Sequence, residues 1–217
     1  MTDIFPGVPR VDTPYEKYRA TAQDCDLLLW SPTGWYGQMI AAATDGPFSH
    51  ISATLWWEDR LMNVGYDRQN GGYASPLRNA VVQWPGRIHV FRVREELRFD
   101  RSRVKARLLG DLGFPYAWSN IRTLALLALP FVRWFATPYS VKRIVAASHA
   151  TPGGICSQHV ARSFANGAGL RFVAKPFEVT TPNDIASSGL CRYVCSLSQV
   201  APPSVEQTPS AMEREVA

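Results

Sequence analysis

The sequence predicts an α+β domain, in which an antiparallel sheet packs against helices. Segments with the period of β-strands gather in the first half of the chain, helical segments follow them, and extended structure returns near residue 190. Strands and helices that are grouped rather than strictly alternating are typical of this class. With 217 residues, 46% of them hydrophobic, the chain is long enough for one domain with a sizeable core.

The first elements follow from apolar spacing and turn residues. The apolar run 26–30 (DLLLW) predicts a strand that ends at a Ser-Pro-Thr-Gly turn, and residues 35–44 carry apolar side chains at helical spacing. Two strands, at 49–58 and 61–66, are joined by the tight polar turn Asp59–Arg60.

Later elements are expected at the following positions: a loop at 67–75, a half-exposed strand at 87–94, helices at 100–112, 120–135, 140–147 and 156–168, and extended segments at 171–179 and 190–198. The polar, proline-containing residues 1–22 are expected to form an N-terminal arm. The domain itself then covers 23–199. Residues 200–217 are rich in Pro, Ser and Glu, which predicts a disordered tail.

Composition restricts the partners and the compartment. The net charge is +5, but basic and acidic residues are mixed and no basic–aromatic stripe is present, so nucleic-acid binding is not expected. No signal peptide is visible, which favours a cytoplasmic protein with reduced thiols. Cys191 and Cys195 have no second Cys/His pair to complete a zinc site, and we expect them to be core residues on one face of a strand. No cofactor is expected.

The most apolar segment, 124–135 (LALLALPFVRWF), is too short to cross a bilayer, which takes about 20 apolar residues. It predicts either a buried helix or an apolar flap that makes peripheral contact with a membrane or an apolar substrate.

Cys156 is the candidate nucleophile. It follows Gly153-Gly154-Ile155 and opens an amphipathic helix. The peptide dipoles leave an effective positive charge at a helix N-terminus, which lowers the pKa of a cysteine there and favours the thiolate. The N–H groups of the first turn lack partners within the helix and can stabilise an oxyanion. The alternative is an ordinary buried cysteine.

His50 is the candidate general base, because it opens an alternating strand that would hold its ring rigidly. Asn63, on the neighbouring strand, is the expected third residue that orients the imidazole, and Asp67 at the end of that strand is its acidic alternative. His159 stands three residues after Cys156 on the same helix and is the rival base. A structural role remains the alternative for each histidine.

These motifs, taken in order, resemble the permuted papain-like branch of the NlpC superfamily (the YiiX/YaeF-like amidases). The resemblance rests on four segments: Asp26-Leu27-Leu28-Leu29, Phe48-Ser49-His50-Ile51, Leu61-Met62-Asn63-Val64, and Ile155 to Val160 (ICSQHV). It covers about residues 24–198. The chain departs from the family pattern at Cys25, where Gly is usual, at Asn63, where Glu is common, and at Gln158-His159, where Glu-Leu is common.

The resemblance implies a permuted papain-like fold and a cysteine amidase or peptidase-like hydrolase. Cys156, His50 and Asn63 would be its catalytic residues, and a cell-wall peptide or a lipid-like amide or ester its substrate. Two alternatives remain. The same residue pair could serve an acyltransferase or thioesterase that acts on lipid-like acyl groups. The fold could also belong to a catalytically inactive binding protein.

Overall fold

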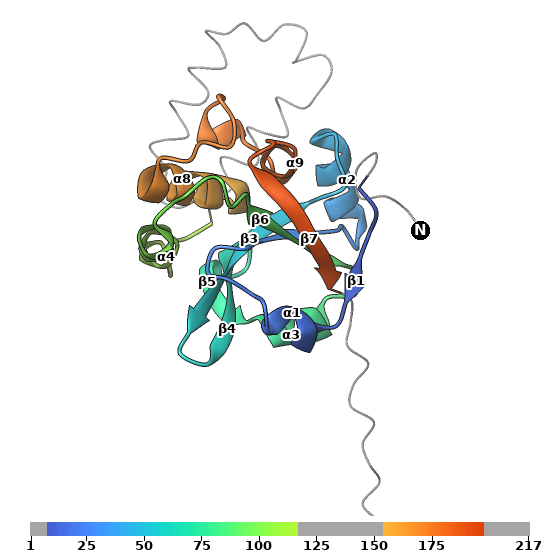
Figure 1. Ribbon diagram of the computed structural model, residues 1–217. Helices are drawn as coiled ribbons and strands as arrows, with labels where there is room; N and C mark the ends of the chain where they lie inside the picture. The colour runs from blue at the N-terminus through green and yellow to red at the C-terminus, as the bar shows by residue number, and fades with distance from the viewer. Residues whose placement is uncertain (1–7, 117–153, 198–217) are drawn as a thin grey trace, which may run out of the picture.

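The computed structural model describes residues 8–116 and 154–197 (Figure 1). Over these residues the chain forms a seven-stranded mixed sheet packed against helices, so the predicted α+β class is confirmed. The spatial order of the strands is β1-β7-β6-β2-β3-β4-β5. The strands are β1 (Asp12–Thr13), β2 (Leu27–Trp30), β3 (His50–Trp57), β4 (Arg60–Asp67), β5 (Gly71–Pro76), β6 (Ile88–Val93) and β7 (Cys191–Leu197).

Helices cover both faces of the sheet. They are α1 (Tyr15–Arg19), α2 (Trp35–Ala43), α3 (Leu77–Gln83), α4 (Arg101–Gly110), α8 (Cys156–Ala168), the 3-10 helix η1 (Phe177–Val179) and α9 (Pro182–Ala186). Helices α4 and α8 pack against each other, and α8 lies on β3 and β4, as Figure 1 shows. Helices α1 and α3 contribute to a second apolar cluster, on the opposite face of the sheet.

Strand β2 is apolar at every position because both of its faces are buried. Leu27 and Leu29 belong to the cluster beneath α8, whereas Leu28 and Trp30 belong to the cluster that includes α1 and α3. A strand that is buried on both faces reads as a continuous apolar run rather than as an alternating one. Each fully buried leucine contributes roughly 1.5–3 kcal/mol to the free energy of unfolding.

Most of the predicted elements are confirmed. The expected strands at 26–30, 49–58 and 61–66 correspond to β2, β3 and β4, and the expected helix at 35–44 corresponds to α2. Helix α8 has the bounds that were predicted for it. Further matches are α4 to the expected helix at 100–112 and β7 to the extended segment at 190–198. The helices expected at 120–135 and 140–147 lie outside the described residues.

The prediction of a loop over 67–75 was wrong for its second half. Residues 71–76 form the edge strand β5, which pairs antiparallel with β4, and helix α3 follows directly. The consecutive glycines and short polar side chains are typical of a loop. An edge strand can have such a sequence, because its backbone hydrogen bonds to one neighbouring strand hold it in place. The extended segment expected at 171–179 was also wrong, since this stretch is irregular and ends in η1.

Strand β6 is buried throughout, although its alternating sequence predicted a half-exposed strand. Its polar residues are satisfied internally. The Arg92 guanidinium donates from Nε to Asp26 Oδ1 at 2.6 Å and from Nη2 to Asp26 Oδ2 at 2.7 Å, and Tyr18 donates to the same carboxylate. Since both charges of this ion pair are buried, removing either one would leave the other uncompensated.

Cys191 and Cys195 are buried core residues, as expected, but they do not share a face. The β6–β7 register shifts between Val90 and Phe91, which is a β-bulge. Cys191 therefore packs in the cluster beneath α8, whereas Cys195 packs in the cluster on the opposite face. A bulge inserts one unpaired residue and reverses the alternation beyond it.

The described part of the N-terminal arm contributes to the fold. Strand β1 pairs in parallel with β7, and Tyr15 and Tyr18 of α1 are buried in the second cluster. Figure 1 shows α1 close to α3 beside the sheet.

Candidate functional site

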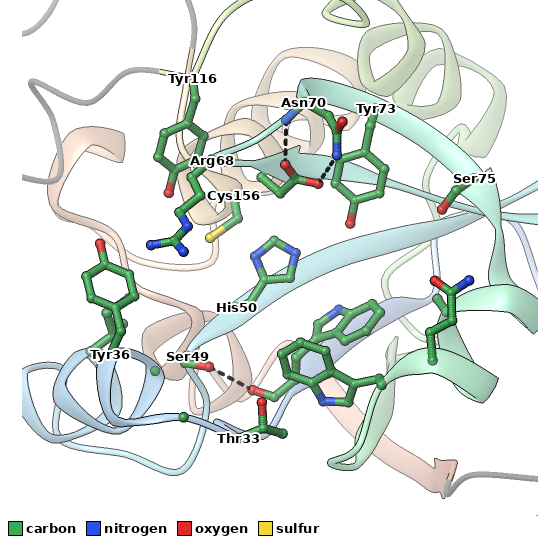
Figure 2. A pocket seen from close by; sticks show the side chains of 18 of the residues that line it. Thr33, Tyr36, Ser49, His50, Arg68, Asn70, Tyr73, Ser75, Tyr116 and Cys156 are labelled. Carbon is green, nitrogen blue, oxygen red and sulfur yellow. Dashed lines mark hydrogen bonds between the residues drawn. The ribbon is translucent and has the colours of Figure 1, made fainter.

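A pocket of about 920 Å³ lies where α2, α3, the start of β3, the turn after β4 and strand β5 meet. Cys156 and His50, the predicted nucleophile and base, both line it. Figure 2 shows the Cys156 sulfur and the His50 ring as neighbours in the middle of the pocket. The two residues are distant in sequence and come together because α8 packs on β3.

The start of α8 is fixed by its side chains, which holds Cys156 in place. The Ser157 hydroxyl donates to the Thr180 carbonyl at 2.6 Å. The Gln158 amide oxygen accepts from the Ile155 N–H at 3.3 Å, and its nitrogen donates to Glu178. These residues are buried, so the first turn of the helix cannot shift without leaving polar groups unpaired.

Cys156 reaches the sheet at a gap between two strands. The β3–β4 ladder ends at the pair Ser52–Gly65, although β3 begins two residues earlier at His50. Beyond that pair the backbone of Ile51 lies close enough to the Cys156 sulfur to lower the pKa of the thiol. The thiol therefore lies beside the backbone of the residue that follows the candidate base.

Burial governs the acidity of this thiol. It raises the pKa of Cys156 above its usual value, and hydrogen bonds from the backbone of Ile51, Ser157 and Cys156 itself only partly oppose the rise. The expectation of a lowered cysteine pKa at the helix start was therefore wrong for the free protein. Removing the sulfur from water disfavours its charged form more than the helix start favours it.

His50 is held as a neutral imidazole. Burial lowers its pKa to about 4, and the charge of Asp67 acts in the opposite direction. The ring packs edge-on against Trp30, with the ring centroids 5.7 Å apart. At neutral pH the site thus combines a protonated thiol with an unprotonated base.

Asn183 anchors the chain just before His50. Its side chain accepts from the Phe48 N–H at 3.0 Å and donates to the Phe48 carbonyl at 2.9 Å and to the Thr44 hydroxyl at 2.8 Å. A Cβ atom on Gly46 would lie 2.4 Å from this side chain, so only glycine fits there. The Thr-Pro-Asn-Asp-Ile segment at 181–185 thus fixes the entry into β3.

Asn63, the predicted third residue, lies opposite Thr54 in the β3–β4 register and does not line the pocket. It donates to the Tyr73 hydroxyl at 3.2 Å, and its own side-chain oxygen is buried without a hydrogen-bond partner. Tyr73 does line the pocket. Within the described contacts, Asn63 therefore reaches the pocket through Tyr73.

Asp67, the acidic alternative, lies in the pocket. It stands at the end of β4, where continuing the Ser52–Gly65 register would bring it opposite His50. One carboxylate oxygen accepts from the N–H groups of Gln69 and Asn70, and the other accepts from the Asn70 side chain. Figure 2 draws the two contacts of Asn70 as dashed lines. Burial is the main cause of the pKa shifts at His50, Tyr73 and Tyr116; the negative charge of Asp67 opposes the lowering at His50 and adds to the rise at the two tyrosines.

His159, the rival base, faces a different region. Its Nδ1 lies 3.1 Å from Asp111 Oδ2 and its ring packs on Tyr66, whereas its Nε2 is buried without a partner. It does not line the pocket. The hydrogen bond with His159 holds the pKa of Asp111 below its usual value.

The sequence did not predict three of the residues that line the pocket. Arg68 and Tyr73 lie within 67–75, where a loop was expected, and Tyr116 lies at the edge of the described region. Of the three, only Tyr116 belongs to a recognisable sequence motif, Gly-Phe-Pro-Tyr at 113–116.

Two further properties of the described residues bear on function. They contain no helix long and apolar enough to cross a membrane. The described residues also contain no group of three or more His, Cys, Asp or Glu side chains that could hold a metal ion. Segment 124–135, the candidate for membrane contact, lies outside them.

The fold and the pocket define an α+β protein with a Cys/His pair at a helix–strand junction. It is similar in fold to the crystal structure of the metalloprotein YiiX from Escherichia coli O157:H7, with a TM-score of 0.54 and 15% sequence identity. The alignment covers 80% of this chain and 96% of that chain. At this identity the similarity shows a shared fold alone. Neither a protein-family model nor a curated protein matches the sequence.

Proposed function

We propose that the protein is a cysteine-nucleophile hydrolase that cleaves an amide or ester bond through an acyl-enzyme at Cys156. The observation that carries the proposal is the shared pocket of Cys156 and His50, with the sulfur against the Ile51 backbone. The YiiX-like fold and the order of the motifs support a permuted papain-like enzyme of the NlpC type.

The chemistry starts from a neutral pair. As the sulfur attacks the substrate carbonyl, His50 takes the thiol proton and the carbonyl electrons move to oxygen. The backbone N–H of Cys156 stabilises that oxyanion. When the tetrahedral intermediate collapses, His50 returns the proton to the leaving group. Water, deprotonated by His50, then attacks the acyl carbon and releases the acid and the thiol.

Asp67 and Asn63 remain the candidates for the residue that supports His50. We favour Asp67, because it lines the pocket and its charge raises the His50 pKa, whereas the described contact of Asn63 is with Tyr73. A carboxylate also stabilises the imidazolium that forms during attack, which an amide does not do by charge.

A catalytically inactive binding protein is the second candidate. Burial favours the uncharged forms of both Cys156 and His50, so the free protein holds no preformed thiolate–imidazolium pair.

Acyl-enzyme formation separates the two candidates. With p-nitrophenyl hexanoate we expect p-nitrophenol release and a hexanoyl adduct on Cys156, detected by mass spectrometry of the acid-quenched protein. Cys156→Ala should abolish the adduct, and His50→Ala should slow acylation by about 100-fold or more. Cys195→Ala is the matched control, because that cysteine is buried in the core away from the pocket. The absence of a Cys156 adduct in the parent protein would favour the binding protein.

A further inference from the structure

The described lining of the pocket contains one side chain that is permanently cationic, Arg68. Among the described residues that line it, Arg68 is the only Arg or Lys and Asp67 is the only Asp or Glu. The Asp67 carboxylate is occupied by the N–H groups of Gln69 and Asn70 and by the Asn70 side chain. No carboxylate of the described residues lies within ion-pair distance of Arg68. Within the part of the chain that the structure describes, Arg68 therefore has no ion-pair partner.

The Arg68 side chain is also oriented. Its guanidinium carbon lies 5.3 Å from the centroid of the Tyr36 ring, a cation–π contact. In the view of Figure 2 the guanidinium lies between Tyr36 and Tyr116, on the side of the pocket where the Cys156 sulfur points. Stacking on an aromatic ring leaves the N–H groups in the plane of the guanidinium available for a planar anion.

The side of the pocket next to His50 has a different character. Trp30 packs edge-on against His50, and Trp84 packs edge-on against Trp30 with ring centroids 5.2 Å apart. Ile40 and Ala80 add apolar surface to the lining. The candidate catalytic pair thus has an apolar wall on one side and a cation on another.

We propose that Arg68, stacked on Tyr36, binds an anionic group of the substrate, so that the protein acts on acyl compounds that carry a carboxylate or a phosphate near the scissile bond. This inference rests on the proposed hydrolase function for its catalytic consequence. The anion-binding site itself does not depend on turnover. A guanidinium binds carboxylate and phosphate through the same paired N–H···O contacts, so both groups belong to the class.

The catalytic test compares two esters of similar length: p-nitrophenyl hexanoate, whose acyl chain is neutral, and the mono-p-nitrophenyl ester of adipic acid, whose chain ends in a carboxylate. We expect the parent protein to prefer the anionic ester in kcat/KM, and Arg68→Gln to reduce that preference about tenfold or more. Arg60→Gln, at the exposed far end of β4, is the control and should keep the preference. An unchanged preference in Arg68→Gln would overturn the proposal.

The binding test uses Cys156→Ala, so that the result does not depend on catalysis. Adipate and inorganic phosphate are titrated separately by calorimetry into Cys156→Ala and into the same variant carrying Arg68→Gln or Arg60→Gln. Binding of either anion that is lost only with Arg68→Gln supports the subsite and identifies its preferred anion, even if no ester is turned over. Failure of both anions to bind, or binding that survives Arg68→Gln, overturns it. If neither ester is hydrolysed, the proposed function fails separately.

Discussion

The Cys156 sulfur lies against the backbone of Ile51, the residue that follows His50 in β3. This contact is possible because the β3–β4 ladder stops at Ser52–Gly65 and leaves the first two residues of β3 unpaired with the last two residues of β4. The base, His50, and the backbone that contacts the nucleophile, Ile51, are therefore consecutive residues of β3. Helix α8 completes the pair by holding its first turn against this strand.

The pH dependence of alkylation at Cys156 tests the state of this pair. Because burial raises the thiol pKa, we expect iodoacetamide labelling of Cys156 to rise with pH and to have a midpoint above the free-thiol value of about 8.5. His50→Ala should slow ester turnover by about 100-fold or more while leaving the labelling midpoint nearly unchanged, because a neutral pair has no ionic contact to lose. Labelling is followed at the Cys156 peptide by mass spectrometry.

A midpoint well below 8.5 that moves upward in His50→Ala would contradict this prediction. It would show that a thiolate–imidazolium pair exists before substrate binds.

Replacing Asp67 with Asn tests which residue supports His50. The Asn side chain keeps an oxygen for the N–H groups of Gln69 and Asn70 but removes the charge that raises the His50 pKa. We expect kcat/KM to fall about tenfold or more and its acid limb to move to lower pH. Asn63→Ala should lower activity without moving the limb, since its described contact is with Tyr73. If Asn63→Ala shifted the acid limb of the kcat/KM profile and Asp67→Asn did not, Asn63 would be the residue that supports His50.

The buried His89 should make the fold acid-sensitive. Its nitrogens contact Ser31 and Ser196, and burial, followed by Arg87 and Arg10, lowers its pKa from 6.5 to about 4. Between these values the unfolded chain binds a proton that the folded chain does not, so the free energy of unfolding decreases as pH falls. Between pH 7 and 4.5 the loss is roughly 2–3 kcal/mol.

Urea denaturation at both pH values checks this prediction. His89→Gln, which cannot titrate at this position, should lose about half as much stability between them as the parent. The half that remains comes from His50, whose pKa is also lowered from 6.5 to about 4. An equal loss in the parent and in His89→Gln would show that His89 is not the source.

The spacing of apolar residues and the positions of turn-forming residues were enough to predict the strands and the helix that bring Cys156 and His50 together. The Leu-rich run of β2, the β3–β4 hairpin and the amphipathic α8 each carry a local signal, and Cys156 and His50 stand at the ends of two of these elements. The walls of the pocket carry no such signal. Strand β5 is recognisable only through its pairing with β4, and Arg68 and Tyr73 contribute to a site only once that edge is formed.

The burial of individual side chains was the other property that could not be predicted from local sequence patterns. The helix start argues for a thiolate at Cys156, but the sign of its pKa shift depends on how completely α8 and the sheet enclose the sulfur. Likewise, the alternation in β6 predicted exposure. Its burial depends on β2 and β7 on either side and on Asp26, which neutralises Arg92.

Cys25 occupies a backbone position that favours glycine, which yields a stability prediction. It has a backbone φ of +68°, the left-handed region that favours glycine, yet its side chain is fully buried. Cys25→Gly removes about 1–2 kcal/mol of backbone strain and loses a comparable burial energy, so we expect a net change within about 1 kcal/mol. Cys25→Ala keeps the strain and should be the less stable variant. Chemical denaturation orders the two, and an alanine variant more stable than the glycine one would contradict the strain argument.

Asn183 should be required for the stability of the chain that leads into His50. Asn183→Ala removes the partners of the Phe48 N–H and carbonyl and of the Thr44 hydroxyl. Phe48 is fully buried, so its backbone groups cannot readily turn to water, and we expect the free energy of unfolding to fall by about 2–4 kcal/mol. Asn79→Ala, on the exposed side of α3, is the control and should change the free energy of unfolding by less than about 0.5 kcal/mol.

Asn183→Ala should also lower activity. Because His50 directly follows the segment that Asn183 holds, kcat in Asn183→Ala should fall even at temperatures where the variant is fully folded. An Asn183→Ala protein with parental stability and parental kcat would show that the turn holds its shape without this side chain.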